Sequence, residues 1–354
     1  MLTQMAAGRV YDYSHSVGRG AQSGMGFSQP VAAAIGPSGT VYVVNRGSEG
    51  VSNVPWYRTA YGARVSRLTI GDASGEEEFI GEFSKYGKDD GEFIWGSGLV
   101  VDQQENIYVS DEWLNQVSVF GKDGTFLMKW STLEQDDGQE HGTAGIARDA
   151  EENIYVTDGR SHEVRKFTRD GKFLTRWGGY GVGNGQFNSP WGITVDTEGY
   201  VYVADHQNHR VQKFTSEGEW VAQMGQPGTG RGGLHLPVGV AVDPDGDVYV
   251  CDWSDNGYHP GRVHIFDKEG KFIITLIGDA QQLSKWAQMT VDANADYLKR
   301  RREVPTTEPE WRFAVPTGVT FDTDKDRLIV VDNQRSRLQI YNKVKEYMVP
   351  QMNL

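Results

Sequence analysis

Aspartates recur in this sequence at a fixed interval of 47 residues, and this interval limits the possible folds more than any other feature. One series comprises Asp102, Asp149, Asp196 and Asp243, and a second comprises Asp111, Asp158, Asp205 and Asp252. A fifth copy carries Asp322 and Asp332, and a degenerate first copy has Gly36 and Asn45 at the same positions. Six units that cannot bury both faces alone are expected to stack radially around an axis, as in a propeller.

Each unit reads as four short β-strands joined by tight turns. Between Pro190 and Gly225, four segments rich in Val, Ile, Tyr, Phe or Trp alternate at period two and end at turn sequences. We therefore predict an all-β, six-bladed β-propeller that spans residues 1–354 as one domain. The isolated strand-like segment Arg9–Val17 is expected to close the last blade beside Leu338–Tyr341, and Tyr347–Val349 is the alternative fourth strand.

Two strings resemble a known repeat family. Val203-Ala204-Asp205-His206-Gln207-Asn208-His209-Arg210-Val211 is similar to the signature of NHL repeats, and so is Pro237-Val238-Gly239-Val240-Ala241-Val242-Asp243. This resemblance implies a propeller of NHL repeats and says little about activity, because function depends on the site carried by a fold.

The composition favours a cytoplasmic protein that binds neither nucleic acid nor membrane. Lys and Arg number 35 against 48 Asp and Glu, which gives a net charge of −13, and such an acidic surface repels phosphate backbones. No apolar run approaches the length of a membrane span. The single cysteine, Cys251, excludes internal disulfides and suits a reducing compartment.

Insertions into the repeat fall mainly on one face, which we call the top. The top carries the loops between second and third strands and the links between blades. Compared with blade four, 14 additional residues follow Asn45, 5 follow Asp252, and 27 separate blades five and six. Residues 279–312 are predicted to form a helical insertion on this face, with a helix over Gln281–Arg302.

The insertions are rich in aromatic residues and are expected to roof the axial opening. They contain Trp56, Tyr57, Tyr61, Tyr258, Trp286, Tyr297 and Trp311. The alternative is that these aromatic side chains only attach the insertions to the propeller.

Two rings of residues are expected near the axis on the top face. The inner ring precedes each first strand and comprises Val31, Ser97, Ala144, Trp191, Val238 and Thr317. The second ring follows each second strand and comprises Arg46, Glu112, Gly159, His206, Trp253 and Asn333. A mostly apolar pocket with a few converging polar groups is the usual form of a small-molecule site. The alternative is that these are ordinary loop residues on a polar rim.

The candidate catalytic residues are Arg46, Glu112 and His206. Arg46 would hold a carboxylate or an oxyanion, while His206 and Glu112 would move protons. The candidate substrate-binding residues are Trp191, Trp253, Arg160, Asn333, Ser97 and Thr317.

Asn45-Arg46-Gly47 is also similar to a segment of peptidylglycine amidating lyase, a zinc-dependent six-bladed propeller. The resemblance implies an active-site role for Arg46. Ser97, Val238 and Thr317 stand where that family has its zinc histidines, and Arg160 stands where it has a tyrosine. The zinc chemistry of that family is therefore not expected here.

A different metal site is one hypothesis. His141, His206 and His235 should all lie on the top face, and imidazoles suit zinc or another divalent ion. Calcium is the second metal considered, but the acidic turn Asp243–Asp247 lacks the downstream glutamate of an EF-hand loop.

Two classes of function remain open. The first is a lyase-like or hydrolase-like enzyme that acts, in a roofed axial pocket, on a small molecule with an anionic or carbonyl group. The second is a non-catalytic NHL module that binds a protein or a ligand through the same face. The enzyme is favoured, because a protein-docking face would be open and flat rather than roofed.

Overall fold

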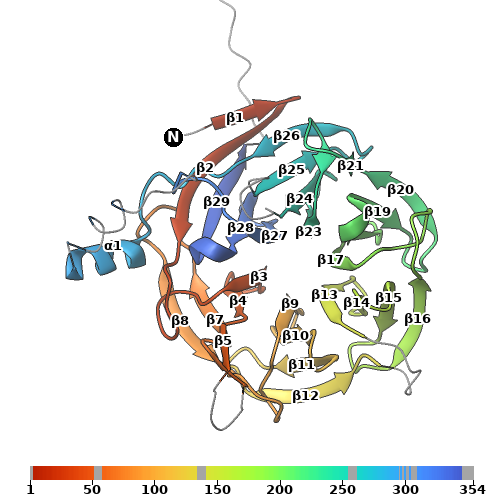
Figure 1. Cartoon of the computed structure of the whole chain (residues 1–354), viewed down its shortest axis with the longest axis horizontal. Coiled ribbons are helices and arrows are strands. Elements are labelled where there is room, and N and C mark those ends of the chain that lie inside the picture. Colours follow the sequence, from red (N-terminus) through yellow and green to blue (C-terminus); the bar gives the residue numbers. More distant parts are fainter. Residues whose placement is uncertain are drawn as a thin grey trace, which may run out of the picture.

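Six antiparallel sheets surround a central axis in the computed structural model of the chain (Figure 1). The structure describes residues 3–51, 58–133, 141–253, 261–294 and 309–344, together with residues 296, 299 and 303. The predicted all-β, six-bladed propeller is confirmed.

In every blade the first strand is innermost and its successors lie progressively farther from the axis (Figure 1). Blade one contains β3 (Pro30–Ile35), β4 (Val41–Asn45), β7 (Arg64–Thr69) and β8 (Glu78–Phe83). Blade two contains β9 (Gly96–Val101), β10 (Ile107–Asp111), β11 (Gln116–Phe120) and β12 (Phe126–Ser131). Blade three contains β13 (Thr143–Arg148), β14 (Ile154–Asp158), β15 (Glu163–Phe167) and β16 (Phe173–Gly178).

The remaining blades follow the same order. Blade four contains β17 (Pro190–Val195), β18 (Val201–Asp205), β19 (Arg210–Phe214) and β20 (Trp220–Met224). Blade five contains β23 (Pro237–Val242), β24 (Val248–Asp252), β25 (Arg262–Phe266) and β26 (Phe272–Leu276). Blade six contains β27 (Pro316–Asp322), β28 (Arg327–Asp332), β29 (Arg337–Val344) and the N-terminal β2 (Arg9–Val17). Two small paired elements, β5 (Ser48–Val51) with β6 (Arg58–Tyr61) and β21 (Gln226–Pro227) with β22 (Gly233–Leu234), lie in top-face connections.

The predicted closure of the ring is confirmed. Strand β2 pairs antiparallel with β29 through seven residue pairs, from Val10↔Val344 to Val17↔Leu338. A further strand that the sequence did not predict, β1 (Thr3–Ala6), pairs with the outer edge of β2. The alternative closing segment, Tyr347–Val349, lies outside the described residues.

The first series of repeated aspartates builds the turns of the bottom face. In blade four, Asp196 Oδ1 accepts hydrogen bonds from the backbone amides of Glu198 and Tyr200, and Oδ2 accepts one from the Tyr202 hydroxyl at 3.0 Å. The same Asp–Tyr pair occurs in blades two, three and five. These carboxylates satisfy buried polar groups and are therefore structural.

The second series of aspartates connects the first strand to the rest of its blade. Asp205 is fully buried, and it accepts hydrogen bonds from the backbone amide of Asn188 and from Arg210 Nε, both at 2.8 Å. Asp252 and Asp332 have the same pair of backbone and arginine partners in blades five and six. The recurring spacing of the aspartates is therefore explained by the fold and does not indicate a catalytic site.

The described part of the helical insertion lies at the circumference of the propeller, away from the axis, which corrects the predicted roof for these residues. Helix α1 (Lys285–Ala293) lies outside β2 and β8, at the junction of blades six and one (Figure 1). Its Trp286 is 1% exposed and packs edge-on against Phe27 and Phe79. The Ser284 hydroxyl caps the helix by accepting from the Ala287 amide, and it donates to the Gly18 carbonyl.

The alternative interpretation of the aromatic insertions holds for Trp286, which attaches the helix to the propeller. Tyr61 is 60% exposed, and Trp311 is half-buried beside Arg312. Trp56, Tyr57, Tyr258 and Tyr297 lie outside the described residues.

Candidate functional site

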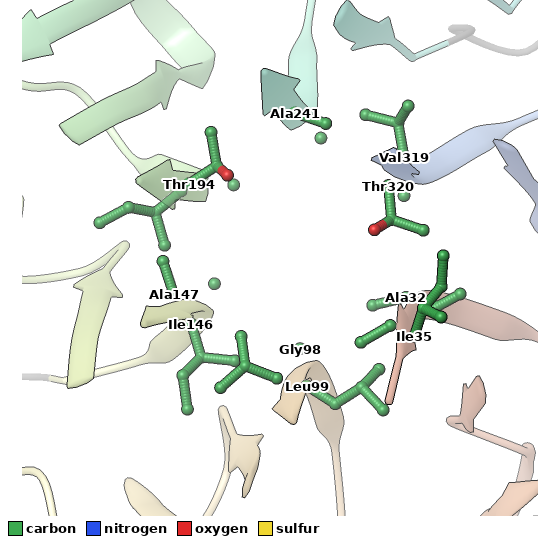
Figure 2. Close-up of a pocket in the computed structure, with 18 of the residues that line it drawn as sticks. Ala32, Ile35, Gly98, Leu99, Ile146, Ala147, Thr194, Ala241, Val319 and Thr320 are labelled. Atoms are coloured by element: carbon green, nitrogen blue, oxygen red, sulfur yellow. The ribbon is translucent and has the colours of Figure 1, made fainter. Parts of the chain in front are cut away.

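An axial cavity of about 600 Å³ is lined by the first strands of all six blades (Figure 2). At its upper end it reaches inner-ring residues such as Val31, Trp191 and Thr317. At its lower end it reaches the bottom-face turns at Pro37, Gln103 and Asp324. Arg46, Glu112 and His206 do not line it. These three residues were predicted to share an axial pocket on the top face. They are not part of this cavity, whose lower end lies at the turns of the bottom face.

Glycines bring neighbouring first strands together near the upper end of the cavity. A Cβ atom on Gly145 would stand 2.3 Å from the Trp191 carbonyl oxygen, and one on Gly192 would stand 2.2 Å from that of Val238. Gly239 and Gly318 meet the next blade in the same way. No larger residue fits at these positions without moving the backbone, so the strands are held in contact just below the inner ring.

Above this level, His206 packs against two tryptophans of the top face, and the three rings contact one another. Its ring centroid is 5.9 Å from that of Trp191 and 6.1 Å from that of Trp253, and the two indoles are 6.4 Å apart. His206 begins a short 3-10 turn directly after β18, and Trp191 and Trp253 come from β17 and the end of β24. All three residues belong to the two rings predicted from the sequence.

The imidazole of His206 is held in one orientation and kept neutral. Its Nδ1 lies 3.1 Å from the carbonyl oxygen of Pro237, so Nδ1–H donates and the lone pair is on Nε2. Burial lowers the pKa of His206 below 6.5. A buried, neutral imidazole with its tautomer fixed by a backbone carbonyl is equipped to accept a proton.

Arg46 and Glu112 form a second group on the other side of the axis. Their side chains are ion-paired, and the Arg46 guanidinium carbon lies 4.8 Å from the ring centroid of Trp95. Trp95 in turn packs edge-on against Trp113 at 5.0 Å. Glu112 is therefore the partner of Arg46.

The sequence did not identify Trp95 and Trp113 as parts of this group. Both stand near residues of the predicted rings. Trp113 directly follows Glu112, and Trp95 stands two positions before Ser97. A search for aromatic residues beside the ring positions would have found both.

Three of the predicted substrate-binding residues bond to the backbone of a blade. Ser97 Oγ donates within 3.0 Å of the Thr143 and Ala144 carbonyl oxygens, and Ser97 is 7% exposed. Thr317 Oγ1 and Asn333 Nδ2 both donate to the Pro30 carbonyl oxygen, at 3.3 and 2.8 Å. These contacts join neighbouring blades. Arg160 is exposed on the top of blade three.

The three histidines predicted to bind a metal do not form one ligand set. His141 donates from Nδ1 to Asp158 Oδ2 at 2.9 Å within blade three. His235 stacks on His209, and His206 bonds to Pro237. Among the described residues, no group of three His, Cys, Asp or Glu side chains could hold a metal ion. The acidic turn Asp243–Asp247 is instead neutralised by Lys343, whose Nζ lies 2.5–2.9 Å from three carboxylate oxygens.

Part of the sequence matches a known family of repeats. The NHL repeat model matches residues 187–214 and 234–266, which lie in blades four and five, so the chain carries NHL repeats there. No curated protein matches the sequence. Within the described part of the chain, no helix is long and apolar enough to cross a membrane.

Several solved structures share the fold at low sequence identity. A protein of unknown function from Bacteroides thetaiotaomicron is 17% identical, with a TM-score of 0.59 over 95% of this chain and 76% of that one. A streptogramin B lyase is 16% identical, with a TM-score of 0.53 over 96% of this chain and all of that one. A catalytically inactive histidine-to-alanine variant of virginiamycin B lyase from Staphylococcus aureus, solved with quinupristin, is 11% identical, with a TM-score of 0.53 over 94% and 100%.

The chain is thus a six-bladed propeller that contains NHL repeats and is similar in fold to these lyases. The resemblance to amidating lyase is not shown by the comparisons.

Proposed function

We propose that this protein is a small-molecule lyase whose active site lies on the top face, with His206 as the general base. The observation that carries the proposal is the fixed, neutral imidazole of His206 in contact with Trp191 and Trp253. The streptogramin B lyases of the same fold, one of them inactivated by the loss of a histidine, support the class of reaction.

Each group of residues would have a separate task in this reaction. Trp191 and Trp253 would bind an aromatic or other flat part of the substrate beside the imidazole. His206 Nε2 would take a proton from the carbon next to a carbonyl group. The electron pair left on that carbon would form a double bond as the bond to the leaving group breaks, and the leaving group would keep the electrons of that bond and gain a proton.

Arg46 would bind the anionic or carbonyl end of the substrate. Glu112 holds one of its terminal nitrogens, and Trp95 supports the face of the guanidinium, so its other donors have a fixed direction. An elimination needs a base and a group that stabilises developing negative charge, and it needs no nucleophile. The lyase is therefore preferred to the hydrolase.

The activity is tested with quinupristin and with a panel of linear and cyclic esters that carry an aromatic ring. Reactions run in ¹⁸O-labelled water distinguish the two chemistries, because hydrolysis incorporates the label and elimination does not. We expect an unlabelled, unsaturated product. Incorporation of the label would overturn the lyase assignment.

Variants of His206 and Arg46 test the assigned roles. His206→Gln should lower kcat by about 10²–10⁴-fold with little change in thermal stability. The matched control is His209→Asn, because His209 lies three residues away at a positive φ of 57°, which Asn tolerates. Arg46→Lys keeps the charge and loses the forked donors, so it should lower turnover by at least about tenfold. Equal activity of the His206 and His209 variants would contradict the proposal.

The second candidate function is a non-catalytic module that docks a protein. Large aromatic side chains are exposed in top-face connections, with Trp113 at 48%, Tyr180 at 70% and Tyr61 at 60%. A docking module would lose partner affinity in Tyr61→Ala or Tyr180→Ala and would be indifferent to His206→Gln. The enzyme is predicted to show the reverse pattern.

A further inference from the structure

The axial cavity below the inner ring has no task in the proposed lyase reaction. Its lining runs from the inner ring to the bottom-face turns and excludes Arg46, Glu112, His206 and Trp253. At about 600 Å³ it is within the range of small-molecule sites in proteins.

The wall of this cavity is polar because it is made of strand edges. Each first strand pairs on one side only, with the second strand of its own blade, so its inner edge turns backbone N–H and C=O groups toward the axis. The side chains among them are small or apolar, such as Ala32, Ala147 and Ala241 (Figure 2). A ligand in this tube would need many hydrogen-bonding groups and a narrow cross-section.

Two hydroxyl groups add to this polar wall. Thr194 of β17 and Thr320 of β27 line the cavity, and they come from blades four and six (Figure 2). Both lie below the level of the glycines that hold the first strands together. They offer acceptors inside the tube, away from the charged turns.

The bottom face around the lower end of the cavity is acidic, and Asp102, Asp322 and Asp324 line the cavity itself. The turns that join first to second strands in blades two to six contain two, three, two, three and three carboxylates, thirteen in all. Basic side chains in or against these turns offset part of this charge, among them Arg9, Arg148, Lys213, Lys325, Arg327 and Lys343. Arg148 lines the mouth itself, but it is paired with Glu152 at 2.8 Å.

We propose that the axial cavity is a binding site for a linear organic polycation of the polyamine type, which enters from the bottom face. The carboxylates at the mouth attract cations and repel anions over about one Debye length, ~8 Å at physiological ionic strength. The ammonium groups donate hydrogen bonds, for which the strand carbonyls, Thr194 and Thr320 are acceptors inside the tube. A chain of methylene and ammonium groups is narrow enough to lie along strand edges.

Isothermal titration calorimetry with spermidine tests the proposal, with glutarate and triethylene glycol as an anion and a neutral chain of similar length. We expect saturable binding of one spermidine, weaker binding as salt is raised, and no binding of glutarate or the glycol. Binding of glutarate as tight as that of spermidine would overturn the proposal.

Three variants distinguish the cavity from general attraction to an acidic surface. Asp324→Asn removes an exposed carboxylate at the mouth and should weaken spermidine binding about three- to fivefold. The matched control Asp170→Asn removes an exposed carboxylate, far from the axis, on the same face and should change binding less than about twofold. The double variant Thr194→Val/Thr320→Val keeps the shape of the tube and should weaken binding at least about tenfold.

The outcomes separate this site from the proposed active site. If Asp324→Asn and Asp170→Asn weaken binding equally and the threonine variant has no effect, spermidine binds only to surface charge and the proposal fails. Thermal melts of all three variants confirm that each is folded. His206→Gln should leave spermidine binding unchanged, so the cavity and the lyase activity succeed or fail independently.

Discussion

The propeller consists of a regular arc and a seam, and the two are stabilised by different contacts. The arc comprises blades two to five, each built from one continuous stretch of four strands. The seam comprises blade six, assembled from both ends of the chain, and its junctions with blades five and one. The arc repeats the hydrogen bond between the turn aspartate and a tyrosine in every blade, whereas the seam is joined by an Asp–Arg pair in that turn, a buried lysine and a buried tryptophan.

The turn networks show the difference most clearly. In the arc, the turn aspartate accepts from a tyrosine of its own second strand, as in Asp196 and Tyr202. In blade six, Asp322 pairs with Arg327 at 2.8 Å instead. At the junction of blades five and six, Lys343 lies among Asp243, Asp245 and Asp247.

The seam also has a buried aromatic side chain where blade six meets blade one. Trp286 of the insertion fills a core formed by both blades, which includes Val17, Leu338 and Phe27. Ion pairs therefore join blade six to blade five, and a buried tryptophan joins blade six to blade one. The seam should accordingly be more sensitive to single changes than the arc.

The largest effect is expected when the closing strand is removed. Deleting residues 1–18 takes away β2, its seven pairs with β29 and the fully buried Tyr11 and Val17, and it leaves β29 as an open edge. We expect loss of cooperative thermal unfolding, or aggregation on expression, measured by circular dichroism and size-exclusion chromatography.

Deleting residues 1–7 is the matched control. It removes only β1, whose side chains are exposed or half-buried, and it should shift Tm by a few degrees at most. If the longer deletion melted like the shorter one, β2 would not be what closes the propeller.

A smaller but still large effect is expected for Lys343→Met. Burial alone would lower the pKa of the Lys343 ammonium, but hydrogen bonds to three carboxylates outweigh burial and raise its pKa. The substitution leaves Asp243 and Asp247 buried without this partner, which should cost about 3–5 kcal/mol in urea unfolding. Because oxygen ligands suit Ca²⁺, millimolar calcium should restore part of the stability of the variant and leave the wild type unchanged.

The corresponding change in the arc is Tyr202→Phe. It removes the 3.0 Å hydrogen bond to Asp196 and should cost about 1–2 kcal/mol. The comparison between arc and seam fails if Lys343→Met costs no more than Tyr202→Phe.

The repeat made the fold predictable, since the 47-residue interval marks blades two to five, degenerate copies mark blades one and six, and Arg9–Val17 is left as the strand that closes the ring. The repeat also placed Trp191 in the inner ring and His206 and Trp253 in the second ring, and both rings lie near the axis on the top face. The Asp–Tyr pair was also within reach, since a tyrosine follows the first-series aspartate by six residues in four blades.

The contacts of the seam could not be predicted in this way. Lys343 is 96 to 100 residues from the aspartates that it neutralises, and no spacing rule relates them. Trp286 was predicted to cover the axis because its insertion starts on the top face. It is instead buried in the apolar cluster shared by blades six and one. The pairing of Glu112 with Arg46 depends on which neighbour each side chain turns toward, and the repeat does not determine this.

The smallest effect expected is a pH dependence of stability that arises more from the arc than from the seam. Burial lowers the pKa of His206 and His264 in the arc and of His15 in the seam below 6.5. As pH falls through about 6.5, the unfolded chain binds protons that the folded protein does not, so the free energy of unfolding decreases. Each histidine contributes at most about 1.4 kcal/mol per pH unit.

Urea unfolding between about pH 7.5 and 5.5 measures this slope, above the range in which most carboxylates titrate. His206→Gln and His15→Gln should each reduce the slope by one proton, because each removes one imidazole that is kept neutral by folding. The two arc histidines together should account for about twice the loss due to His15. A stability that stays constant or rises as the pH falls to about 5.5 would show that these imidazoles are not held neutral, and it would also remove the basis for His206 as a base.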